Sequence, residues 1–231
     1  ARDSFESRQK DISGRINAGE QELEEQKKQR EACLEELEQW KTYREPEPER
    51  GEEVARNRQI LREKGIPYLE FYKLVDFDRR LEEEKAARLE EALWRMGILD
   101  ALIIPAEYRE QVLSGETGVC DKYLFTDAAQ VRENLMELLD IENGENDILL
   151  YQNVSRILSA IEHCGLGKSS YGAGRGSWID EKGNYGMGVL EGTTTGTYTA
   201  RYIGASSRER YRQSVIRELE EEKTRLEEEI R

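Results

Sequence analysis

Residues 23–40 read LEEQKKQREACLEELEQW, a charged stretch in which apolar side chains recur every three or four positions. Setting Ile16 as position a of a heptad gives nine a and d positions, six of them apolar. The nine are Ile12, Ile16, Gly19, Leu23, Gln26, Arg30, Cys33, Leu37 and Trp40. No proline and only two glycines occur in residues 1–44. This part of the chain is therefore predicted to be one long amphipathic helix with a coiled-coil seam.

A second helix is predicted at the other end of the chain. Residues 206–231 contain neither proline nor glycine, and Ser206 to Glu209 have the spacing of a capping box at a helix start. Its 3–4 spaced positions are Ile216, Leu219, Lys223, Leu226 and Ile230. Each amphipathic stripe needs a cover, so we expect the two helices to pair antiparallel with each other. The alternative is that they are charged helices on the surface of a globular enzyme.

The middle of the chain has a different composition, because residues 51–205 hold 17 of the 19 glycines. Prolines at 46 and 48 end the first helix and predict an elbow over 45–50. The expected organisation is an N-terminal arm (1–50), a folded unit (51–205) and a C-terminal arm (206–231). The expected fold class is α+β, with a small mixed α/β domain inserted at the tip of an antiparallel coiled-coil hairpin.

Within the middle unit, turn residues and apolar spacing predict alternating helices and strands. Helices are expected at 52–64, 82–96, 127–139 and from Asp147 to about Ile161. Strands are expected at 72–77, 99–104 and 122–125.

The segment from Gly165 to Gly204 stands apart, with eleven glycines in forty residues. A β-hairpin is expected with strands at 178–180 and 184–187, followed by a second strand region over 193–203. Glycine within strands marks bulges or close approach of another backbone. Either the segment is a β-meander with flexible turns, or it is a surface where strand edges of two subunits meet.

Composition excludes several classes of protein. The longest purely apolar run has four residues, too short to cross a bilayer, so the chain is expected to be soluble, cytoplasmic and without a membrane partner. Three cysteines without CxxC spacing give neither a disulfide framework nor a zinc signature, and no metal is expected.

No catalytic constellation emerges from the sequence. Gly167-Lys168-Ser169 resembles the end of a phosphate-binding loop, but Glu162 replaces the required glycine and the preceding segment is expected to be helical instead of a strand. His163 has no evident partner. The chain is therefore expected to be non-enzymatic and without a cofactor. Two alternatives stay open: a coiled-coil-tethered nucleotide-binding enzyme domain, with a pocket beside Lys168, and a scaffold for partner proteins.

One region is basic against a formal net charge of −14, because residues 163–217 hold eight bases and four acids. Such a patch suits salt-sensitive contacts with DNA phosphates, although a solvated helix face is the plainer explanation. The candidate DNA-binding residues are Lys168, Arg175, Lys182, Arg201, Arg208, Arg210 and Arg212.

Several short strings resemble the central region of the MukB-like SMC subunit of Wadjet plasmid-defence systems, a condensin-like family, over roughly residues 52–217. The strings are Gly65–Pro67, Tyr72–Phe77, Leu89–Leu93, Gly97–Ala101 and Tyr202–Ala205 followed by Arg208.

The resemblance implies an SMC-like hinge that joins two copies into a homodimer at the ends of their arms. It implies ATPase heads outside this stretch, loop extrusion on duplex DNA, and kleisin and nuclease subunits as partners of the parent protein. SMC hinges often have a glycine-rich pattern at their dimer contact. The nearest equivalent in this sequence is a group of glycines with one neighbouring tryptophan, which forms the candidate interface. These are Gly172, Gly174, Gly176, Trp178, Gly186 and Gly188.

Overall fold

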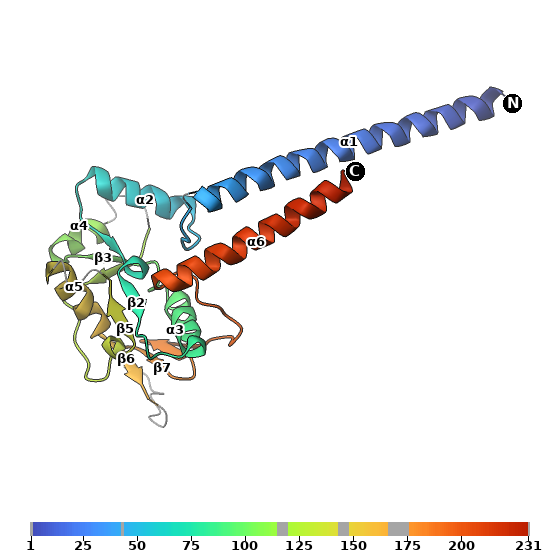
Figure 1. The fold of residues 1–231 in the computed structure, drawn as a ribbon. Coiled ribbons are helices and arrows are strands. Elements are labelled where there is room, and N and C mark those ends of the chain that lie inside the picture. Colours follow the sequence, from blue (N-terminus) through green and yellow to red (C-terminus); the bar gives the residue numbers. More distant parts are fainter. Residues whose placement is uncertain (1, 43, 115–119, 143–147, 166–175, 231) are drawn as a thin grey trace. The chain divides into compact units, whose positions relative to one another are not determined.

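The computed structural model describes residues 2–42, 44–114, 120–142, 148–165 and 176–230, with side chains described in these ranges except at 2–11 and 148–150 (Figure 1). The chain forms two compact units: an arm unit of residues 1–45 and 210–231, and a globular unit of residues 46–209. The sequence predicts the boundaries of the folded unit after residue 50 and after residue 205. Across the described part of the chain, no helix combines the length and apolarity that crossing a membrane demands.

Two long helices, α1 (Arg2–Thr42) and α6 (Ala205–Glu229), supply the arm unit. Their contacts run in opposite directions along the two sequences. Arg212 donates to the backbone carbonyl oxygens of Trp40 and Lys41, whereas Arg30 lies 3.5 Å from the carboxylate of Glu227. The expected antiparallel pairing is therefore confirmed.

The seam of the arm unit follows the predicted heptad. Leu37, Trp40 and Ile216 form a buried apolar cluster, and the Trp40 ring meets the Tyr211 ring edge-on at 6.2 Å. Ile12 and Ile16 are more than half exposed. Among the described residues no helix covers them, since α6 ends at Glu229.

The globular unit contains four helices in its described residues. Glu83 and Glu84 open α3 and suit the positive end of its helix dipole, and Gly97, at φ 75°, ends it. The helices are α2 (Glu52–Glu63), α3 (Glu83–Arg95), α4 (Arg109–Leu113) and α5 (Ile148–Leu158).

Three small sheets and three short 3₁₀ turns complete this unit. The first has the order β1-β3-β4, with β3 and β4 parallel, and the second pairs β2 with β5 antiparallel. The third, the four-stranded sheet, has the order β6-β7-β8-β9. The strands are β1 (Leu69–Glu70), β2 (Val75–Phe77), β3 (Leu102–Ile104), β4 (Tyr123–Phe125), β5 (Leu139–Ile141), β6 (Ile161–Cys164), β7 (Ser177–Asp180), β8 (Asn184–Met187) and β9 (Leu190–Thr193). The turns are η1 (Phe71–Lys73), η2 (Ala106–Tyr108) and η3 (Leu135–Glu137).

The main core of this unit lies around α3. Leu89 and Leu93 of α3 pack with Leu158 of α5 and Ile179 of β7. A second apolar cluster joins α2 to the first sheet through Leu61, Ile66, Leu102, Ile104 and Val112. The predicted α+β class, with a mixed unit inserted in sequence between two paired helices, is confirmed.

The prediction of a helix at 127–139 is wrong. Asn134 is extended, its side chain accepts the Met136 N–H at the start of η3, and Leu139 pairs with Phe77 in the second sheet. Pairing with a distant strand overrides the local helical spacing.

The strand region predicted at 193–203 is also wrong. β9 covers only Leu190–Thr193, and backbone N–H groups of Thr195 and of 201–203 bind side chains of α3 instead of a strand. α6 begins at Ala205, one residue before the predicted cap.

The predicted helix through Ile161 ends at Leu158, and β6 follows it. A strand therefore precedes Gly167-Lys168-Ser169, contrary to expectation, although Glu162 still occupies the glycine position of the motif.

Candidate dimerisation surface

The β8–β9 hairpin presents an apolar end to solvent. Met187 pairs with Leu190 across a two-residue turn, and Gly188 in that turn has φ 63°, a conformation that favours glycine. Val189 is 96% exposed, and Met187 and Leu190 are each exposed by more than two fifths. A contiguous group of exposed apolar side chains is typical of an interaction site.

β9 is also an unpaired sheet edge. It is the last strand in the order β6-β7-β8-β9, and in the described part of the chain no strand lies on its far side. The opposite edge, β6, is partly covered, because His163 donates its backbone N–H to Glu133 and Asn134 forms a bridge with Glu162. The free backbone groups of β9 can therefore pair with another strand.

A groove of about 450 Å³ lies beside a second unpaired edge, β4. Residues of α4, α5, β4 and the third sheet line it, together with Ile98, which follows α3, and Asp127, Ala128 and Ala160. Its lining residues are Ile98, Arg109, Tyr123, Leu124, Phe125, Asp127, Ala128, Ile157, Ala160, Ile161, Ser177 and Met187.

Hairpin and groove belong to one continuous patch, because Met187 is part of both. A two-fold symmetric interface uses the same patch on both copies, so each partner must carry a projecting part and a receiving part. This patch carries both.

Glycines of the four-stranded sheet accommodate aromatic rings of the same chain. Trp178 lies opposite Gly186, and a Cβ at Gly186 would overlap the Trp178 indole. Tyr185 lies over Gly192 in the same way. Trp178 is buried. Gly186 is thus needed for packing within one chain, whether or not a partner is present.

The other glycines proposed for the interface lie at different places in the chain. Gly176 is exposed directly before β7, and Gly188 forms the hairpin turn. Gly172 and Gly174 lie outside the described residues. The apolar hairpin end and the β4 groove were not among the candidates from the sequence. The sequence feature that could have indicated the hairpin end is the Gly188-Val189 turn between two apolar residues.

The basic candidates are distributed over both units. Arg208, in the globular unit, donates to Glu142 at 3.0 Å and to the Tyr202 carbonyl oxygen at 3.1 Å. Arg212, in the arm unit, is held by the end of α1, and Arg210 is exposed there. Lys182 is exposed in the β7–β8 turn. Lys168 and Arg175 lie outside the described residues.

Arg201 belongs to a group of cations and aromatic rings. Its guanidinium lies 5.5 Å from the centre of the Tyr198 ring, which stacks at 6.5 Å on Trp94. Arg95 lies 5.7 Å from the Trp94 ring centre, and Trp94 is 52% exposed. Trp94 is thus an exposed ring that stacks on the half-buried Tyr198, with a cation beside each ring, and such a group suits contacts with nucleic acid bases and phosphates.

Side chains that can bind a metal ion do not gather into a metal-binding site in the described residues. In those residues no cluster of three or more His, Cys, Asp or Glu side chains is arranged to hold a metal ion. His163 lies 4.0 Å from the Glu137 carboxylate, in a small hollow of about 100 Å³.

The fold resembles three solved SMC hinge structures. A Pyrococcus furiosus Smc hinge domain with an extended coiled coil is 16% identical, with a TM-score of 0.43, over 98% of this chain and 83% of that one. A second hinge structure from Pyrococcus furiosus is 13% identical, with a TM-score of 0.39, over 66% and 92%. An asymmetric dimer of the Geobacillus stearothermophilus SMC hinge domain is 14% identical, with a TM-score of 0.39, over 92% and 94%. No protein-family model and no curated protein match the sequence.

Proposed function

We propose that this chain is the hinge of an SMC-like protein and that it joins two copies into a homodimer. The observation that carries the proposal is the continuous patch in which the exposed apolar end of the β8–β9 hairpin adjoins the β4 groove. It belongs to an α+β unit inserted in sequence between two helices that pair antiparallel. That arrangement suits a protein whose long arms must be connected at one end.

In the proposed dimer, the apolar end of one hairpin fills the groove of the other copy. Val189 and Leu190 would lose their exposure to water, and the free edges of β9 and β4 would gain backbone partners. Two such contacts, related by the two-fold axis, would close the interface.

The parent protein is proposed to be the MukB-like subunit of a Wadjet plasmid-defence system, on the strength of the strings between residues 65 and 208. Its ATPase heads would extrude DNA loops, and kleisin and nuclease subunits would join it in the bacterial cytoplasm. The hinge itself would supply a connection and no catalysis, without a cofactor.

The test is the solution mass of the chain, measured by light scattering after size-exclusion chromatography over a concentration series. We expect a mass near twice 26.8 kDa. Val189→Asp combined with Leu190→Asp should raise the dimer dissociation constant by at least about tenfold, because it places charges in the apolar contact. Leu113→Asp is the matched control, since Leu113 is 61% exposed and lies outside the groove.

Two results would contradict the proposal. A wild-type monomer at every concentration would remove dimerisation. A dimer that persists in the hairpin variant would place the interface elsewhere on the chain.

DNA contact is a second proposed function, carried by the stacked Trp94–Tyr198 pair with Arg95 and Arg201 beside it. Trp94→Ala combined with Arg201→Gln should weaken binding of labelled oligonucleotides, measured by fluorescence anisotropy at low salt. Duplex and single-stranded probes separate phosphate contact from base stacking. Unchanged binding of both probes by this variant would refute the role of the group.

A further inference from the structure

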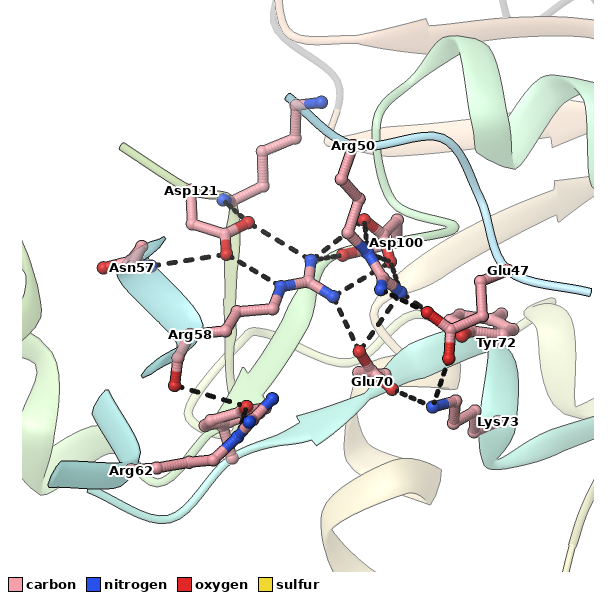
Figure 2. Close-up of polar contacts among 12 residues, drawn as sticks. Glu47, Arg50, Asn57, Arg58, Arg62, Glu70, Tyr72, Lys73, Asp100 and Asp121 are labelled. Atoms are coloured by element: carbon pink, nitrogen blue, oxygen red, sulfur yellow. Dashed lines mark hydrogen bonds and ion pairs between the residues drawn. The ribbon is translucent and has the colours of Figure 1, made fainter. Parts of the chain in front are cut away.

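Residues 46–51, here called the N-root, lead from α1 into the globular unit and are fixed to its core. Pro46 and Pro48 are buried, and Glu47 between them is exposed. The Arg50 guanidinium binds the Asp100 carboxylate through Nε at 2.9 Å and through Nη2 at 2.8 Å (Figure 2). It also donates to the Tyr72 hydroxyl at 3.2 Å. Arg50 therefore ties the end of this segment to Asp100 of the globular unit.

The carboxylate that holds Arg50 is itself positioned by a buried cation. Arg58 of α2 donates to Asp100 at 2.9 Å, to Glu70 at 2.8 Å and to Asp121 at 3.1 Å (Figure 2). Its side chain is only 3% exposed. Buried charges are tolerated where they are fully paired, so this network fixes the geometry around the N-root.

Residues 198–204, here called the C-root, lead into α6, and one carboxylate accepts several of their hydrogen bonds. Glu90 of α3 is completely buried. It accepts backbone N–H groups of Arg201 at 2.6 Å, Tyr202 at 3.2 Å and Ile203 at 2.8 Å, and the Tyr198 hydroxyl at 2.9 Å. Three successive N–H groups thus point at one side chain.

Both roots meet at one pair of rings. Tyr72, which accepts from Arg50, contacts Tyr202 edge-on, with ring centres 6.3 Å apart and planes at 75°. Both rings are buried. Tyr202 is the residue whose N–H binds Glu90. An unbroken series of contacts therefore runs from Arg50 through Tyr72 and Tyr202 to Glu90, within the globular unit.

We propose that the Tyr72–Tyr202 contact couples the two roots, so that loosening one root loosens the other. Close packing permits little independent movement of either ring, since the interior has no space to absorb a displacement. The globular unit would then pass a change at the N-root to the C-root. This inference does not depend on dimerisation.

The test measures amide hydrogen exchange in the full chain. Arg50→Gln removes the bidentate bond to Asp100 and should speed exchange of residues 201–203 by about fivefold, a size typical of coupling within one network. Glu90→Gln places an amide NH₂ against the N–H donors and should in turn speed exchange at residues 50–54. Arg80→Gln is the control, because Arg80 is exposed and pairs with Asp78 at the surface.

A second pair of variants isolates the ring contact. Tyr202→Leu keeps an apolar side chain but removes the ring, and in that background Arg50→Gln should no longer change exchange at 201–203. Arg50→Lys, which keeps the charge, replaces Arg50→Gln if the latter does not fold.

Two outcomes would overturn the coupling. Faster exchange at the N-root with wild-type exchange at 201–203 would show independent roots. Equal acceleration everywhere, including residues 151–158 of α5, would show a general loss of stability instead of a specific connection.

Discussion

The two roots of the globular unit are held by opposite electrostatic arrangements. At the N-root, two arginines and Lys73 lie among the carboxylates of Glu47, Glu70, Asp100 and Asp121. At the C-root, one carboxylate faces backbone N–H groups. The first arrangement depends on the identity of many side chains. The second depends on Glu90 and on the backbone path of 201–203, so side chains there can vary without loss of the bonds.

The N-root network should show the larger effect when its central cation is removed. Arg58→Met leaves three carboxylates without their shared partner and should lower the free energy of unfolding by about 3–5 kcal/mol. Urea unfolding followed by circular dichroism measures this. Arg62→Met, one turn further along α2 and exposed, is the control and should change stability by less than about 0.5 kcal/mol. Equal effects of the two variants would remove the special role of Arg58.

Removal of the Glu90 carboxylate from the C-root should give the second largest loss of stability. Glu90→Ala leaves three N–H groups and a hydroxyl without their acceptor and should cost about 2–3 kcal/mol in the same assay. Glu84→Ala provides the comparison, because Glu84 is an exposed residue of the same helix. A cost below 1 kcal/mol would mean that water replaces the carboxylate and that the Glu90 hydrogen bonds do not hold the C-root.

Gly204, where the C-root turns into α6, tests whether the backbone path itself matters. It has φ 77°, and a Cβ there would overlap the Asp76 carboxylate. Gly204→Ala should therefore cost about 2 kcal/mol. Gly196→Ala, with φ 73° but open space around it, should cost only the backbone strain, about 1 kcal/mol. Equal costs would show that the Asp76 contact relaxes freely.

The smallest expected difference is in the pH dependence of stability. The stability contributed by the two roots should change with pH in opposite directions. Burial acts to raise the pKa of Glu70, but its bond from Lys73 and the charges of Arg50 and Arg58 lower it below 4.5. Burial raises the pKa of Glu90 above 4.5 despite its hydrogen bonds. A lowered pKa gives stability that is lost as pH falls below 4.5, whereas a raised pKa gives stability that is lost as pH rises above 4.5.

Melting temperatures of Glu70→Gln and Glu90→Gln between about pH 3 and pH 7 check these signs. The deficit of Glu70→Gln relative to the wild type should shrink as pH falls below 4.5. The deficit of Glu90→Gln should shrink as pH rises above 4.5. Parallel slopes for the two variants would contradict the assigned pKa directions.

Local patterns in the sequence predicted the elements that do not rely on distant partners. The helix through Leu89 and Leu93, its end at Gly97, and the hairpin around Gly183 all lie where spacing and turn residues placed them. The failures at 127–139 and 193–203 have one cause. In both segments the backbone binds residues far away in the sequence, Phe77 in one case and Glu90 in the other.

The candidate surface was foreseen only in part. The glycine-rich segment drew attention to the four-stranded sheet, but Trp178 and Gly186 pack against each other inside it. The exposed part, Met187 to Leu190, is four residues long and has no periodicity that marks it. The opposing β4 groove combines residues between 98 and 187.

By itself, the sequence determined the two arm helices, their antiparallel pairing and the mixed α/β unit between them, because apolar spacing every three or four residues requires a covering partner. Only the tertiary structure decided where Glu90 and Arg58 are buried and which sheet edges stay open. Those outcomes depend on contacts between residues up to 113 positions apart, such as Glu90 and Ile203, and no local pattern encodes them.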